Sequence, residues 1–213
     1  MNERRWFAGF ALAAGISSAL AVLMPPPPDL PGDQLLAYIN AHKPAVASAA
    51  IALLVWMSVS IPFVAGLGVV LAGERRILAS GATLLSAGGI LILAFASFIS
   101  LGSFLALAAA AGTGAGGETG FHVAVWKNLG YFMSDPGLMA WGFGQFLFAA
   151  LAWNGAILPR WLAVIGFIGG IAGLLTLAVY QTAMLALVQF AAFAIWGVAT
   201  GVIVLRRKTL LTA

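Results

Sequence analysis

Residues that could perform acid–base or metal chemistry are scarce in this chain. The sequence contains two histidines, His42 and His122, six acidic residues and no cysteine. The missing cysteines exclude disulfides, thiolate metal sites, iron–sulfur clusters and a cysteine nucleophile. Two histidines are also too few to hold the two b-type haems of a membrane cytochrome through paired histidine ligands. We therefore expect no bound cofactor.

Several of the charged residues and both histidines are predicted to share one face of the molecule. Glu118 and His122 are four residues apart, so on a helix they would meet and could bind a divalent cation. No recognised ligand spacing accompanies them, and we expect solvated loop charges rather than a metal site. The sequence also lacks the GxSxG, HExxH and P-loop motifs. We expect no catalytic residues and no enzyme. The other members of this face are His42, Asp29, Asp33 and Asp135.

A second group of polar residues lies inside apolar runs. Gln145 and Gln189 are amides that would be costly to expose to lipid, so each should face protein or a cavity. Trp141 precedes Gln145 by one helical turn. Together with Ser100, and with His122 near its mouth, these residues predict a mostly apolar pocket open to the outer side. The alternative is plain hydrogen bonding between helices, worth ~0.6 kcal/mol on average in membranes.

The composition indicates whether the helices that carry these residues are surrounded by water or by lipid. The chain is 62% hydrophobic and 8% charged, against about 25% charged in soluble proteins. A surface this apolar indicates a lipid bilayer. We expect an all-α membrane protein that forms one polytopic domain over residues 1–213. The predicted transmembrane spans are residues 6–24, 45–72, 77–108, 136–157, 159–179 and 183–205.

Two short helices are predicted to lie on the outer surface between the spans. Residues 33–42 place Leu35, Leu36 and Ile39 on one face, and residues 121–133 carry a similar apolar stripe. Ser134-Asp135-Pro136 then looks like the start of the next helix, with a cap followed by proline. The apolar run 77–111 is longer than a bilayer requires, so it must tilt, project or end early.

The distribution of positive charge predicts the orientation. With both termini in the cytoplasm, eight Lys and Arg residues fall inside and two, Lys43 and Lys127, fall outside. This is a strong positive-inside bias. The first apolar run could instead be a cleaved signal peptide, since Ala19-Leu20-Ala21 fits a cleavage site. We expect it to be retained as the first helix.

Glycine pairs four residues apart predict close helix packing in the last two spans. In an apolar helix this spacing lets two backbones approach. Internal packing of these helices is the favoured interpretation, and a homo-oligomeric contact is the alternative. The predicted packing residues are Gly166, Gly169, Gly170, Gly173, Gly197 and Gly201.

One motif and the general layout resemble a known family. The motif is Trp141-Gly142-Phe143-Gly144 followed by Leu158-Pro159-Arg160-Trp161-Leu162-Ala163-Val164-Ile165-Gly166. With a basic start and the Glu74-Arg75-Arg76 turn, the chain resembles a bacterial family of six-helix integral membrane proteins catalogued only as a domain of unknown function. The layout covers nearly the whole chain, and the motif covers residues 141–173. The resemblance implies the bacterial cytoplasmic (inner) membrane but no activity.

Two functions remain open from the sequence. The first is binding or carrying a small lipophilic molecule in the outward-opening pocket. The second is a structural or accessory role as a subunit of a larger membrane complex. The charged residues can all be placed at span ends, which argues against a proton pump or a voltage sensor. The expected partners are the bilayer, a lipophilic ligand or a membrane-complex protein, and not nucleic acid.

Overall fold

The computed structural model describes residues 3–23, 30–111, 119–155, 157–176, 178 and 183–206. The predicted loop at 112–117, the predicted break at 180–182, and Asp29, Glu118, Arg207 and Lys208 lie outside these ranges. All regular structure within them is helical. The helices are α1 (Glu3–Leu23), α2 (Gly32–Ala41), α3 (Lys43–Ala72), α4 (Arg76–Ala111), α5 (Thr119–Asn154), α6 (Arg160–Leu175) and α7 (Ala183–Arg206).

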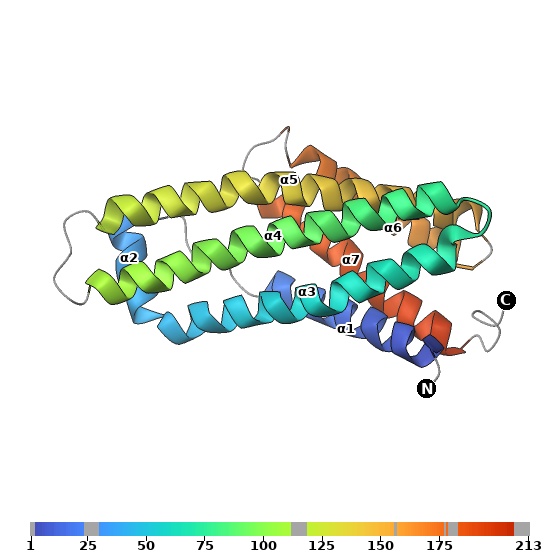
Figure 1. Cartoon of the computed structure of the whole chain (residues 1–213), viewed down its shortest axis with the longest axis horizontal. Coiled ribbons are helices and arrows are strands. Elements are labelled where there is room, and N and C mark those ends of the chain that lie inside the picture. Colours follow the sequence, from blue (N-terminus) through green and yellow to red (C-terminus); the bar gives the residue numbers. More distant parts are fainter. Residues whose placement is uncertain are drawn as a thin grey trace.

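The two longest helices, α4 and α5, lie antiparallel along their length (Figure 1). Each has 36 residues, which makes it ~54 Å long. Their contact is lined by small residues at seven-residue intervals. On α5, Gly130, Gly137 and Gly144 face Ser100, Leu93 and Ser86 of α4, respectively. We call this contact the α4–α5 seam. A spacing of seven keeps one helix face turned toward its neighbour over many turns.

The seam explains why α5 does not begin where the sequence indicates a start. The predicted short helix at 121–133 and the predicted span from Pro136 form one continuous helix, with Pro136 inside it. That part of the prediction is wrong. Proline deprives a helix of one hydrogen bond, but here contacts with α4 at Gly130 and Gly137 hold both sides of Pro136 in register. The run at 77–111 is likewise helical throughout as α4.

A second, smaller core lies at one end of the α4–α5 pair, which we call the α2 end. Helix α2 crosses the ends of α4 and α5 there (Figure 1). It buries Leu35 and Ile39, and α3 contributes Val46. The buried partners on α4 and α5 are Leu101, Phe104 and Val123. A helix is therefore present at residues 32–41, close to the predicted 33–42.

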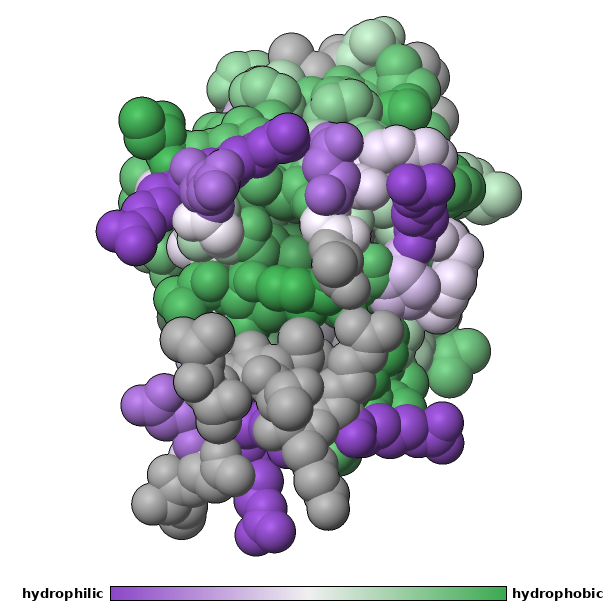
Figure 2. All heavy atoms as spheres, turned by 90° about the vertical axis from the view of Figure 1, so that its right-hand side faces the viewer, coloured by the Kyte–Doolittle hydropathy of each residue, from purple (hydrophilic) through white to green (hydrophobic). Residues whose placement is uncertain are grey.

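The opposite end of the molecule, which we call the arginine end, carries most of the positive charge. Arg4, Arg76, Arg160 and Arg206 lie at or near the ends of α1, α4, α6 and α7. Arg4 Nε donates a hydrogen bond of 2.8 Å to the Val204 carbonyl, which joins the start of α1 to the end of α7. Figure 2 shows hydrophilic residues, in purple, around this end of the molecule.

The shorter helices α1, α6 and α7 pack beside the half of α3, α4 and α5 nearest the arginine end (Figure 1). Glycines mediate these contacts too. Gly197 and Gly201 of α7 lie against α1, where an added Cβ at Gly197 would stand 2.7 Å from the Ala11 carbonyl oxygen. Gly166 and Gly170 of α6 lie against α5, and Gly166 also meets the Trp196 ring of α7. All six predicted packing glycines therefore lie at helix contacts within the chain.

Four helices are long and apolar enough to cross a membrane. They are α1, α3, α4 as far as Leu107, and α7 from Met184. Helix α6 is apolar but shorter, with 16 residues. The protein is thus helical, with four candidate membrane-spanning helices in the described part of the chain.

The α4–α5 seam can be tested by adding one methyl group. An added Cβ at Gly137 would lie 2.9 Å from Leu93 N and 3.0 Å from Gly89 O, so Gly137→Ala must push the two backbones apart. We expect a loss of ~1–3 kcal/mol, or roughly 2–12 °C in the melting temperature, measured by thermal unfolding in detergent. Gly88→Ala on α4 is the control, because an added Cβ there meets nothing within 4 Å. Equal melting temperatures for the two variants would contradict the seam.

Candidate functional site

The centre of the bundle holds a cluster of aromatic rings around Trp141 of α5. Trp141 is fully buried. Its ring lies edge-on to Trp56 of α3 at 5.3 Å between centroids, and to Phe190 and Phe193 of α7 at 4.9 and 5.0 Å. Edge-to-face rings at these distances attract each other beyond their apolar burial. This aromatic cluster therefore joins three helices that are distant in the sequence.

Two buried amides lie beside the aromatic cluster, and glycines of α6 make room for them. Gln145 follows Trp141 by one turn of α5, and its amide faces Gly169. One turn further along α6, Gly173 faces the amide of Gln189 from α7. A Cβ at Gly173 would stand 2.7 Å from both polar atoms of Gln189. Any larger residue at these two positions would displace the amides.

The hydrogen bonds of the two amides are incomplete. Gln189 Nε2 donates to the Leu138 carbonyl of α5 at 3.1 Å. Among the described residues, Gln189 Oε1, both polar atoms of Gln145 and Trp141 Nε1 have no hydrogen-bond partner. A buried polar group without a partner costs ~1–3 kcal/mol. Such a site could be completed by water or by the polar group of a bound molecule.

Three of the five residues of the predicted pocket come together, and two lie elsewhere. Trp141, Gln145 and Gln189 form the buried centre just described. Ser100 faces Gly130 in the α4–α5 seam and donates a 2.8 Å hydrogen bond to Ala96 of its own helix. It lies about three helical turns, or ~16 Å, from Gly89, which contacts Trp141.

His122 is displaced further from this centre. Because α5 is continuous, His122 lies about five turns, or ~28 Å, from Trp141 along the helix axis. Its side chain is exposed at the α2 end. Ser100 and His122 therefore do not line one void with Trp141, and the predicted five-residue grouping is corrected to the three buried residues.

The predicted pocket did not include Trp56, Phe190 and Phe193. One signal could have identified them. Tryptophans of membrane proteins gather at the two bilayer interfaces, yet Trp56, Trp141 and Trp196 lie well inside predicted spans. All three are buried, and the indoles of Trp56 and Trp196 donate hydrogen bonds to Ser18 and to the Leu162 carbonyl. A tryptophan in mid-span thus indicates contact between helices.

The chemistry available at this centre is hydrogen bonding and apolar contact. Amides and indoles neither gain nor lose charge near neutral pH, so they cannot act as a general acid or base. The carboxyl group of Asp135 lies about two turns, or ~9 Å, from Trp141 along α5 toward the α2 end. Within the described ranges, no three His, Cys, Asp or Glu side chains are grouped so that they could hold a metal ion. The centre is suited to packing or to binding a neutral molecule.

Comparison with known proteins adds no family or relative. No protein-family model, no curated protein and no solved structure matches this chain.

The state of the two amides can be tested with a pair of matched substitutions. Gln145→Met keeps the length of the side chain and removes an amide without a partner, so we expect an unchanged or higher melting temperature. Gln189→Met removes the bond to Leu138, and we expect a lower melting temperature. The measurement is thermal unfolding of the purified protein in detergent. A marked loss of stability in Gln145→Met would show that this amide has a partner, such as water or a ligand.

Proposed function

We propose that this protein is a six-span accessory subunit of a membrane complex, which docks a partner through the face of α5 beyond the bilayer. The spans would be α1, α3, α4, α5, α6 and α7, in the bacterial cytoplasmic membrane. The charge asymmetry supports this orientation, because the arginine end would face the cytoplasm with both chain termini. The α2 end would face outward.

The length of the helices supports a part that projects from the membrane. From the arginine end, a hydrocarbon core of ~30 Å accommodates about 20 residues of a helix. On α5, counted from Asn154, this distance ends near Asp135. On α4, counted from Arg76, it ends near Ala96. The remainder of both helices, with α2 and the start of α3, forms the second core. This part would project beyond the hydrocarbon on the outer side.

One observation carries the proposal of a partner. Four large apolar side chains form a stripe on the projecting part of α5, which we call the α5 stripe. They are Phe121, Val125, Leu129 and Phe132, with exposed fractions of 70%, 44%, 39% and 69%. Their spacing places them on one helix face. Lipid covers an apolar stripe only inside the bilayer. Because the α5 stripe would lie outside the bilayer, its exposed apolar side chains indicate a contact with another protein.

The position of the stripe favours a partner helix that leaves the membrane beside α5. The contact of α6 with α5 reaches Gly142 through Gly173, and α6 ends at Leu175. The face of α5 therefore becomes uncovered toward the α2 end. In the bilayer the exposed face continues with Phe143. A transmembrane helix of the partner that extends beyond the bilayer, as α5 does, could contact this face along its whole length. Its apolar side chains would then repeat at the same helical spacing as those of the stripe.

A second candidate function is binding of a small lipophilic molecule. The observation that favours it is Gln145, a buried amide with two unpartnered polar atoms beside the Trp141 ring. An apolar molecule with one polar group would satisfy the amide and contact the aromatic cluster. An unchanged or higher stability of Gln145→Met would count against this candidate, because the amide would then have no partner to lose.

The proposed orientation can be tested by cysteine labelling, because the chain has no native cysteine. Glu74→Cys and Asp33→Cys each place one thiol at an exposed position, at the arginine end and the α2 end respectively. In intact cells we expect a membrane-impermeant maleimide to label the Asp33→Cys variant. We expect it to reach the Glu74→Cys variant only after lysis. Labelling of both, or of Glu74→Cys alone, in intact cells would contradict the orientation.

The proposed partner contact can be tested by photo-crosslinking in the native membrane. A photoreactive amino acid at Val125 should yield one discrete adduct with another integral membrane protein. The adduct should be lost when Leu129→Ser is added. The same probe at Gln34, an exposed position of α2 outside the stripe, is the control and should give no such adduct. Crosslinks at Val125 to lipid alone, or to a second copy of this chain, would contradict the accessory-subunit proposal.

A further inference from the structure

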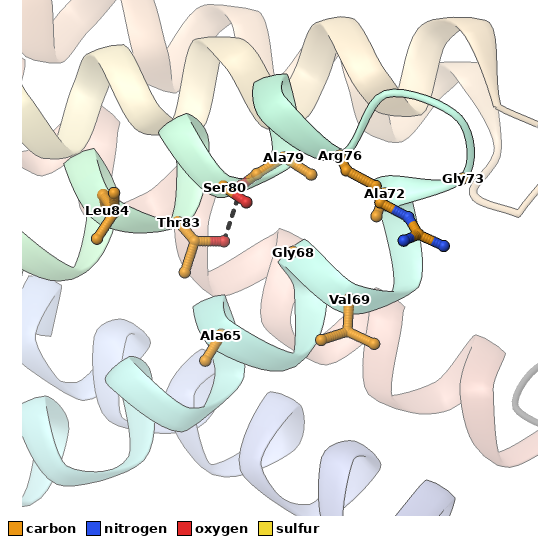
Figure 3. Close-up of a pocket in the computed structure, with 10 residues that line it drawn as sticks. All are labelled: Ala65, Gly68, Val69, Ala72, Gly73, Arg76, Ala79, Ser80, Thr83 and Leu84. Atoms are coloured by element: carbon orange, nitrogen blue, oxygen red, sulfur yellow. Dashed lines mark hydrogen bonds between the residues drawn. The ribbon is translucent and has the colours of Figure 1, made fainter.

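An open groove lies between α3 and α4 next to the arginine end (Figure 3). Its volume is about 710 Å³. The floor consists of small residues, including Gly68 and Ala79, which are buried. The rims carry Val69 of α3 and Leu84 of α4, both 75% exposed. The groove thus opens on the outer surface of the helix bundle, between the exposed sides of α3 and α4.

The turn between α3 and α4 fixes the shape of the groove. Gly73 has a φ of 43°, a conformation that side chains other than glycine rarely adopt. The Arg75 N–H donates to the Ala72 carbonyl at 2.7 Å, which closes the turn. Further along, the Thr83 hydroxyl lies against Gly68 and donates to the Ala79 carbonyl at 2.9 Å. The two helices are therefore held together at the floor while their rims stay apart.

The end of the groove near the turn has a net charge of +1, from Arg75 and Arg76 against the single acid Glu74. Arg76 lines the groove there, and its side chain extends past Ala72 (Figure 3). Arg75 is its neighbour, and both are exposed. Arg76 is also the first residue of α4, so the free N–H groups of the first turn add to the positive potential. This end is complementary to an anion such as a phosphate group.

The apolar part of the groove is slightly shorter than the hydrocarbon of one leaflet. From Arg76 to Leu84 the groove follows α4 for about two turns, or ~12 Å. Half of a ~30 Å hydrocarbon core is ~15 Å. A chain lying on the small-residue floor would therefore remain within the leaflet whose headgroups are level with Arg76. An acyl chain with a phosphate at its head matches both the charge and the length.

We propose that the groove between α3 and α4 binds one anionic phospholipid, with an acyl chain on the floor and the phosphate at Arg76. Basic residues at the membrane surface attract anionic lipids by electrostatics alone. The groove adds a defined place for the chain, so binding depends on shape as well as charge. The inference is independent of the partner contact at the α5 stripe.

The experiment measures binding of phosphatidylglycerol and phosphatidylcholine, with identical acyl chains, to the full-length protein by native mass spectrometry. We expect phosphatidylglycerol to bind more tightly. Arg76→Gln should reduce this preference about fivefold, because the bound phosphate loses its attraction to the basic side chain that lines the groove. Arg160→Gln is the matched control, since Arg160 starts α6 outside the groove. It should leave the preference nearly unchanged.

A second variant tests the shape of the groove without a change of charge. Ala65 is exposed and lines the groove, so Ala65→Phe should fill it and weaken binding of both lipids, with an unchanged melting temperature. Equal effects of Arg76→Gln and Arg160→Gln, or undiminished binding to Ala65→Phe, would overturn the proposal. Displacement of phosphatidylglycerol by millimolar inorganic phosphate would also overturn it, because the acyl chain would then contribute nothing.

Discussion

Close backbone contact between α4 and α5 is the constraint on which the rest of the structure depends. In a bilayer, apolar side chains gain little by leaving lipid for protein, so helices associate through tight packing instead. The α4–α5 seam provides it, with Gly130, Gly137 and Gly144 at intervals of seven residues. It extends into the α2 end, where the same two helices provide Leu101, Phe104 and Val123 of the second core. One continuous contact thus supports both parts of the molecule.

Glycine on the other helices has a second consequence, which is the burial of polar side chains. Gly169 and Gly173 of α6 leave space that the amides of Gln145 and Gln189 occupy. In water a pair of amides would gain little from this position, whereas in lipid their alternative is an unsatisfied group facing hydrocarbon. Small residues on one helix therefore determine where polar residues of its neighbours can lie. This coupling places the candidate site at the junction of α5, α6 and α7.

The sequence allowed prediction of an all-helical chain with apolar spans and of residues for close helix packing. It did not allow prediction of which residues on different helices come into contact. Pro136 follows a good cap and therefore indicated a helix start. The contacts of Gly130 and Gly137 with α4 join residues distant in the sequence, so the residues around Pro136 do not reveal them. Ser100 and His122 were grouped with Trp141 by assumed depth. The pairing of α4 with α5 instead places Ser100, and the continuity of α5 places His122. The seven-residue glycine spacing was present in the sequence and would have indicated that continuity.

The uninterrupted course of α4 has a mechanical implication for both proposals. The helix begins at Arg76, beside the groove, and passes through the seam to the second core without a break among its described residues. Its partner α5 carries Trp141 of the aromatic cluster and, further along, the α5 stripe. Packed helices move as rigid elements, because close-packed contacts resist small deformations. The two ends of the pair therefore share one orientation relative to the membrane, and a change in tilt at the arginine end moves the stripe as well.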